Sequence, residues 1–176
     1  MKVQSRILAL ICAILLTTVA NADVIEKGPY LQNPDTTGIT ICWVTDFISP
    51  SVVEYGLTSE LGGSLTVEVG RRNLWNAGGD DDAKAFHQVR IDSLQPGTQY
   101  YYRVRSGDVV SATHTFSTSK RPDHSVRFVA FGDTRPTDNH RNVMSLISAI
   151  DPAPDFLLHT GDMVSNGQRW PDWKGY

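Results

Sequence analysis

The chain has 176 residues and carries 16 lysine and arginine residues against 19 acidic residues, so its formal net charge is −3. A mildly acidic chain without a cluster of basic residues argues against nucleic acid as the main partner. The length fits one or two domains.

Residues 1–22 have the pattern of a secretory signal peptide. Lys2 and Arg6 flank an apolar stretch of 14 residues that ends at Ala20, and a small-x-small cleavage motif ends at Ala22. Because 14 apolar residues are too few for a membrane span, we expect cleavage after Ala22 rather than a retained anchor. The mature protein is therefore expected to be secreted or periplasmic and without a membrane association.

Residues 23–118 read as a series of short strands separated by turns. In "GITICWVT", Ile39, Ile41 and Trp43 alternate with residues that point to the other face, and "FHQVRIDSL" and "QYYYRVRSG" alternate in the same way. Several short alternating strands within about 100 residues are typical of an all-β sandwich.

The segment "SLQPGTQYYYRV" has the spacing of a tyrosine corner. Tyr100 follows Leu94 and a Pro-Gly pair, so its hydroxyl group is expected to bond back to the preceding turn. Tyr100, Tyr102 and Val104 would then point inward. This part of the chain resembles a fibronectin type III or immunoglobulin-like domain.

The two-residue alternation of apolar residues ends at residues 119–125, a polar stretch that we expect to be a linker. Residues 126–131 form an apolar strand, Thr137 or Asp138 is suited to cap a following helix, and residues 156–158 form a second apolar strand of the kind buried on both faces. Strand, helix and strand in this order predict a βαβ unit with a parallel strand pair.

Each of these two strands is followed by a Gly-Asp pair. Ligands bind beyond the carboxyl ends of parallel strands, where Asp133 and Asp162 are expected to lie close together. Neighbouring carboxylates repel unless a cation lies between them, and hard oxygen ligands suit Mg²⁺, Mn²⁺, iron or zinc. One aspartate could bind a single ion while the other bridges two. Alternatively, each aspartate caps a helix or closes a turn.

A family resemblance favours the metal-site interpretation. "FVAFGDT" and "DFLLHTGDMVSNG" resemble the first two metal-binding motifs of the calcineurin-like metallophosphoesterase superfamily. "GPYLQNPDTTGITICWVTD" and "LQPGTQYYYRV" resemble the accessory domain of purple acid phosphatases. The joint order of sandwich, Gly-Asp strand and Gly-Asp strand is more specific than either motif.

The resemblance implies a secreted dimetal hydrolase of the acid phosphatase type, which cleaves phosphate mono- or diesters by means of a metal-bound hydroxide. Asp133 would bind one of two ions (Fe, Zn or Mn), and Asp162 would bridge both. Two positions depart from the family pattern. Ser165 stands where purple acid phosphatases have a metal-binding tyrosine, and Arg135 stands where many superfamily members have a histidine. Arg135 would contact a substrate phosphate or remain a solvated loop residue.

The same resemblance implies that the metallophosphoesterase domain only begins here. Residues 126–176 would be its incomplete start, with the catalytic residues and the remaining metal ligands after Tyr176, so that this fragment alone is expected to be inactive. "QRWPDWKGY" looks like the first turns of a further helix. The alternative from another functional class is a secreted fibronectin-type binding module without catalysis.

Overall fold

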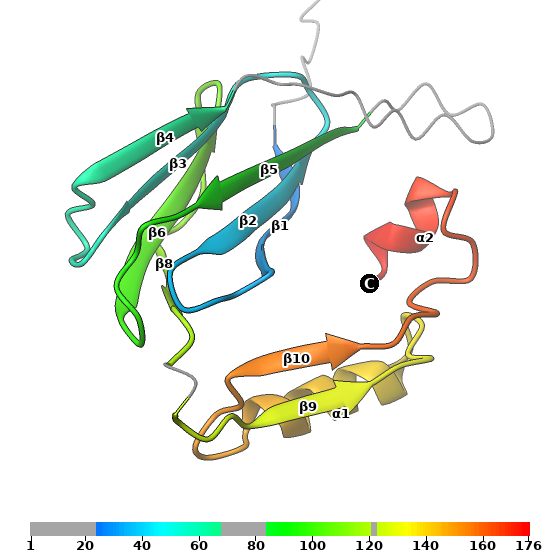
Figure 1. Ribbon diagram of the computed structural model, residues 1–176. Helices are drawn as coiled ribbons and strands as arrows, with labels where there is room; N and C mark the ends of the chain where they lie inside the picture. Colours follow the sequence, from blue (N-terminus) through cyan, green and yellow to red (C-terminus); the bar gives the residue numbers. More distant parts are fainter. Residues whose placement is uncertain (1–23, 68–83, 121–122) are drawn as a thin grey trace, which may run out of the picture.

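The computed structural model describes residues 24–67, 84–120 and 123–176. The expected signal peptide, at residues 1–22, lies outside these ranges. Within them the chain forms a β-sandwich followed by a small βαβ unit and a short final helix (Figure 1). None of the helices in the described ranges combines the length and the apolar character that crossing a bilayer requires.

The sandwich consists of two antiparallel sheets, as the alternating pattern predicts. The first sheet has the strand order β1-β2-β5 and the second β4-β3-β6-β7, with β8 paired to β6. The strands are β1 (Ile25–Gln32), β2 (Ile39–Thr45), β3 (Ser51–Gly56), β4 (Gly63–Val67), β5 (Ala85–Ile91), β6 (Gln99–Ser106), β7 (Val109–Val110) and β8 (His114–Ser117). Their facing sides enclose one hydrophobic core, which confirms the predicted sandwich.

Strand β2 is buried along its whole length. Ile41 and Trp43 point into the core and are fully buried, and the indole N–H of Trp43 donates a hydrogen bond to Ser106 Oγ at 2.8 Å. Residues on the other face of β2, such as Val44, are buried as well. A strand in an ordinary two-layer sandwich has one solvated face, so another part of the chain must cover the outer side of this sheet.

The tyrosine corner forms as its spacing predicts. The hydroxyl oxygen of Tyr100 accepts a hydrogen bond from the Gln95 backbone N–H at 3.0 Å. Tyr100, Tyr102 and Val104 are buried, whereas Tyr101 and Arg103 on the alternate positions of β6 are partly exposed. The bond ties the turn before β6 to the strand itself.

A buried histidine is held in the core by two hydroxyl groups. The His87 ring stacks on Trp43 with 4.8 Å between ring centroids, and its Nε2 and Nδ1 atoms each lie 2.8 Å from a hydroxyl oxygen, of Thr45 and Ser51. The Thr45 hydroxyl donates its own proton to the Phe47 carbonyl, so it must accept from Nε2–H, which leaves Nδ1 to accept from Ser51. Burial lowers the pKa of His87 to about 4.

The βαβ unit has the predicted order and pairing. It consists of β9 (Phe128–Phe131), α1 (Asp138–Ser148) and β10 (Phe156–His159), and β9 and β10 are parallel. Thr137 caps α1 by accepting a hydrogen bond from the His140 N–H at 3.2 Å.

The prediction that residues 156–158 are buried on both faces is wrong for this structure. The side chains of Phe156, Leu157 and Leu158 are 37%, 43% and 49% exposed. Two strands and one helix are too few to cover both faces of a parallel sheet, and Ile147 is the only buried residue of α1.

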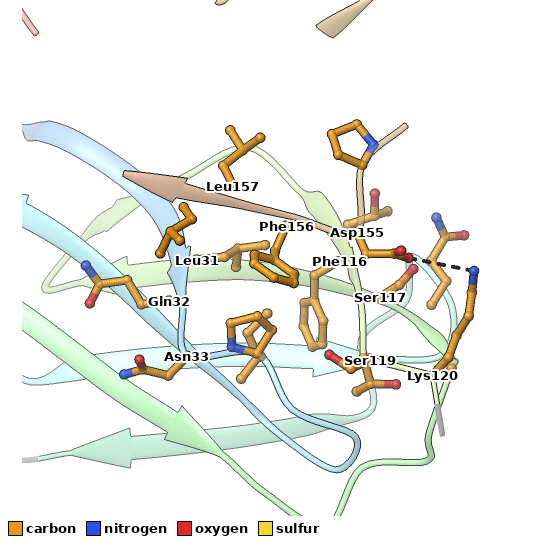
Figure 2. Close-up of a pocket in the computed structure, with 18 of the residues that line it drawn as sticks. Leu31, Gln32, Asn33, Phe116, Ser117, Ser119, Lys120, Asp155, Phe156 and Leu157 are labelled. Carbon is orange, nitrogen blue, oxygen red and sulfur yellow. Dashed lines mark ion pairs between the residues drawn. The ribbon is translucent and has the colours of Figure 1, made fainter. Parts of the chain in front are cut away.

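An open groove of about 1110 Å³ separates β10 from the sandwich. Figure 2 shows Phe156 directed toward Leu31 and Phe116 of the sandwich, while Leu157 points away. At one end of the groove Lys120 forms an ion pair with Asp155 at 3.7 Å. This long ion pair between two partly exposed side chains links the start of β10 to the sandwich.

The final helix α2 (Trp170–Lys174) lies against the outer face of the β1-β2-β5 sheet, and it begins where the sequence predicts a helix. Trp170 is buried there and meets Phe86 of β5 edge to face, with 6.1 Å between ring centroids. The ammonium group of Lys84, which pairs with Glu26 at 2.9 Å, lies 5.8 Å from the Trp170 ring centroid. These contacts show that α2 covers part of the outer face of this sheet, next to Phe86 and near Val44.

Candidate functional site

The two Gly-Asp pairs leave adjacent strands at the same sheet edge. Phe131, the last residue of β9, pairs with His159, the last residue of β10. The ladder continues into the turns, because the Thr160 N–H donates to the Phe131 carbonyl at 2.9 Å and the Asp133 N–H to the Gly161 carbonyl at 3.0 Å. The expected shared edge is therefore present, and it places the two aspartate turns side by side.

Three residues of these turns have an unusual backbone conformation. The φ angles of Asp133, Arg135 and Asp162 are 51°, 38° and 52°, in the left-handed region that few non-glycine residues adopt. Such conformations cost free energy and persist only where the surroundings impose them, and they cluster at functional sites. Three of them in two adjacent turns single out this sheet edge.

The two glycines are required for different physical reasons. Gly161 has a φ of 115°, which strains any residue with a side chain. Gly132 has no left-handed φ, but a Cβ atom on it would lie 2.0 Å from the Thr160 hydroxyl oxygen. A sharp backbone turn therefore explains the glycine at position 161. At position 132 the reason is the close packing against Thr160.

Arg135 forms an ion pair with one of the two aspartates. Its Nη2 and Nε atoms donate to the same carboxylate oxygen of Asp162, at 2.9 and 3.2 Å. The two side chains remain 55% and 42% exposed. Asp133 has no hydrogen-bond partner for its carboxylate among the residues that the structure describes, so a carboxylate on each turn remains accessible to a ligand.

Behind the turns lies a hydrogen-bonded cluster that the sequence motifs did not reveal. The Gly161 N–H donates to His159 Nδ1 at 3.0 Å, so in the neutral ring Nε2 carries the proton and donates to the Thr134 hydroxyl oxygen at 2.9 Å. The hydroxyl groups of Thr134 and Tyr176 are 3.1 Å apart, and the Tyr176 ring stacks on His140 with 4.7 Å between centroids. No local sequence signal could show that Tyr176 returns to this edge.

The donor chemistry of Asp133 and Asp162 suits metal ions, but it supplies only part of a ligand set. Zinc takes about four ligands and magnesium about six. Throughout the described ranges, no three His, Cys, Asp or Glu side chains come together as a potential metal site. Ser165 is exposed. The two aspartates thus fit such ions as carboxylate ligands, and further ligands would have to be added to them.

Comparisons with known proteins point to one family. Residues 29–118 match the family model of the purple acid phosphatase N-terminal domain. The chain is 33% identical over 141 residues to acid phosphatase type 7 of Mus musculus, which covers 78% of this chain and 31% of that protein. It is 29% identical over 160 residues to phosphoenolpyruvate phosphatase of Allium cepa, covering 85% and 31%. The chain therefore spans about a third of the length of these relatives.

Solved structures share the fold. A purple acid phosphatase (PPD1) from yellow lupin seeds superposes with a TM-score of 0.64 at 22% identity, over 88% of this chain and 32% of that chain. The structure of PhoD superposes with a TM-score of 0.52 at 16% identity, over 75% and 26%. The 88% coverage exceeds what the sandwich alone can supply, so the similarity extends into the βαβ unit.

Proposed function

Since the chain belongs to the purple acid phosphatase family through its N-terminal domain, we propose that it is the amino-terminal portion of a secreted dimetal phosphoesterase. The substrate would be a phosphate monoester or diester. In this proposal residues 126–176 begin a calcineurin-like metallophosphoesterase domain, and residues 1–22 direct the protein out of the cytoplasm. The names of the relatives, which are acid phosphatases, support the hydrolase class.

One observation carries the proposal. Asp133 and Asp162 leave neighbouring parallel strands at the same edge, each after a required glycine and each with a left-handed backbone. Helix capping does not account for Asp133, because Thr137 supplies the cap of α1. The arrangement instead supports paired carboxylates that face a common ligand.

Each residue would have a distinct role. Asp133 would bind one ion and Asp162 would lie between both, while two ions of Fe, Zn or Mn would supply Lewis-acid activation of the phosphate ester and of water. Arg135 would exchange partners. Its guanidinium group neutralises Asp162 in this structure, and a metal ion on that carboxylate would free its N–H groups to bind a phosphate oxygen.

The remaining ligands and the group that protonates the leaving oxygen would be supplied by protein outside residues 1–176. This proposal follows from the partial ligand set and from the share of the relatives that the chain covers. We expect residues 23–176 alone to retain metal weakly and to give no useful hydrolysis.

The test is Asp162→Asn in the full-length protein. Loss of the bridging carboxylate should remove stoichiometric metal, measured by mass spectrometry of the metal content, and lower hydrolysis of p-nitrophenyl phosphate more than about 100-fold. The control is Asp138→Asn, because Asp138 is an exposed carboxylate on α1 paired with Arg141. Undiminished turnover in Asp162→Asn would contradict the proposal, and a wild-type protein without iron, zinc or manganese would favour a binding module.

A further inference from the structure

The aspartate turns are connected to the sandwich by a continuous path of contacts. The path begins at Lys27 on β1, whose ammonium group donates to the backbone oxygens of Lys174 and Tyr176 at 3.2 and 3.3 Å. Lys27 therefore holds the segment after α2 against the sandwich. Lys27, Trp173 and Tyr176 also line a cavity of about 520 Å³ on this side of the sheet.

Tyr176 continues the path into the βαβ unit. Its hydroxyl group is hydrogen-bonded to that of Thr134, the residue after Asp133. The Thr134 hydroxyl is in turn hydrogen-bonded to Nε2 of His159. His159 accepts the Gly161 N–H, directly before Asp162. Both aspartate turns are thus held from behind by one cluster, and the Tyr176 side chain links that cluster to the sandwich.

A second close contact supports the same connection. A Cβ atom on Gly175 would lie 3.3 Å from the Pro136 ring, so the segment after α2 packs tightly on the loop that follows Asp133 and Arg135. The turns need such support, because left-handed non-glycine residues cost on the order of 1–3 kcal/mol each and must be held by their surroundings. The exposed sheet β9-β10 offers little packing of its own.

We propose that Tyr176 is a positioning residue, which fixes the two aspartate turns relative to the sandwich through Thr134 and His159. The sandwich then takes part in shaping the candidate metal site through β1. The relevance of this role to hydrolysis rests on the proposed function, whereas the mechanical connection does not depend on it.

The mechanical part is tested by hydrogen exchange in the full-length protein, labelled from milliseconds to hours and read by mass spectrometry. Tyr176→Phe keeps the ring but removes the hydroxyl, and Lys27→Met removes the contact on the sandwich side. In both variants the amides of residues 131–135 and 159–163 should exchange about five- to tenfold faster, the effect of losing one hydrogen bond. The exchange of β2 and β6 should not change.

Two matched controls separate this path from nonspecific loosening. Tyr101→Phe removes a tyrosine hydroxyl from β6, and Lys120→Met removes the ion pair between Lys120 and Asp155 at the other end of β10. Neither should change exchange at the aspartate turns. Unchanged exchange in both Tyr176→Phe and Lys27→Met, or equal acceleration in the controls, would overturn the proposal.

The functional part is tested by titrating the metal-free full-length protein with Mn²⁺ in a calorimeter. Tyr176→Phe should weaken binding about 10- to 100-fold, as loss of supporting contacts around metal ligands does, and Thr134→Ser should restore most of what Thr134→Val loses. Wild-type Mn²⁺ affinity in Tyr176→Phe would overturn the positioning role. If the wild-type protein binds none of Mn²⁺, Zn²⁺ and iron when titrated with each, the proposed function fails, while the exchange experiment still decides the connection.

Discussion

His87 shows how a single side chain makes the sandwich sensitive to acid. The ring is 2% exposed, stacks on Trp43 and is bonded at both nitrogens to hydroxyl groups of β2 and β3. A second proton would have to displace the hydrogen bond that Ser51 donates to Nδ1. The core therefore accepts the neutral ring and rejects the charged one.

We predict that the sandwich loses stability as the pH falls from 6.5 to about 4. The pKa of His87 is about 4 in the folded chain and 6.5 in the unfolded chain, so within this window only the unfolded chain binds the proton. The neutral His87 ring therefore makes its full contribution to the free energy of unfolding above pH 6.5, and this contribution, on the order of 3 kcal/mol, is lost by about pH 4. Urea unfolding at several pH values measures it.

His87→Gln should flatten this part of the pH profile, although it lowers stability at neutral pH because two hydroxyl groups lose their partner. The comparison is His124→Gln, which changes an exposed histidine and should keep the wild-type profile. An unchanged slope in His87→Gln would show that other groups cause the acid sensitivity.

The alternation in β5 predicts that His87 points inward, but its partners lie 36 and 42 residues away and cannot be predicted from local sequence.

At the scale of the elements, adding a methyl group at the glycine after either strand should destabilise the fold, but for a different reason at each position. Gly132→Ala places a Cβ against Thr160, which should cost about 1–3 kcal/mol of folding free energy, as overpacking does. Gly161→Ala strains the backbone and should cost more than about 1 kcal/mol. Thr160→Ala should relieve the first substitution and not the second. Urea unfolding of the full-length protein measures each variant and the double variants.

Gly167→Ala is the neutral comparison, since Gly167 faces open space and has no left-handed φ. Equal rescue of both glycine variants by Thr160→Ala would show that the two turns share one steric cause.

Strand alternation, the helix cap at Thr137 and the two Gly-Asp strand ends could all be predicted, because each depends on neighbours in sequence. The reason for Gly132 could not, because its contact comes from a different strand.

At the scale of the whole molecule, the βαβ unit leaves apolar side chains uncovered. Phe128 is 54% exposed, Leu158 49% and Leu146 of α1 71%. Exposed apolar side chains in such number mark surfaces that are normally covered, and they promote self-association when bare. The sandwich also exposes single apolar side chains, such as Ile48 at 53% and Leu57 at 54%, but its core is enclosed between two sheets and α2 covers part of its outer side.

We therefore predict that residues 23–176, expressed alone, exchange their amides much faster in residues 126–160 than in β2 and β6. Few buried apolar contacts mean a low free energy of local opening. Hydrogen exchange measures the contrast, and light scattering should show self-association that increases with concentration. A single cooperative transition with protected amides across residues 126–176 would contradict this prediction.

The fold class was predictable because both of its parts have a regular sequence pattern. Apolar residues alternate every second position in the sandwich, and an apolar strand, a helix and a second apolar strand follow one another after it. Of the candidate site, local spacing predicted Asp133 and Asp162, since it marks strand ends, and the family resemblance added Arg135 as a possible substrate contact. The contact of Arg135 with Asp162 and the role of Tyr176 depend on residues 27 to 42 positions apart in the chain. Such contacts follow from the path of the chain in space.

The covered outer face of the β1-β2-β5 sheet limits how evolution can recombine this sandwich. Val44 and Phe86 are cross-strand partners on that face, and Trp170 meets Phe86 there. The match to the family model of the N-terminal domain ends at residue 118, well before Trp170. A gene rearrangement that joined residues 29–118 to an unrelated partner would leave an aromatic surface without its cover. The sandwich is therefore inherited more safely together with its neighbour than as an independent module.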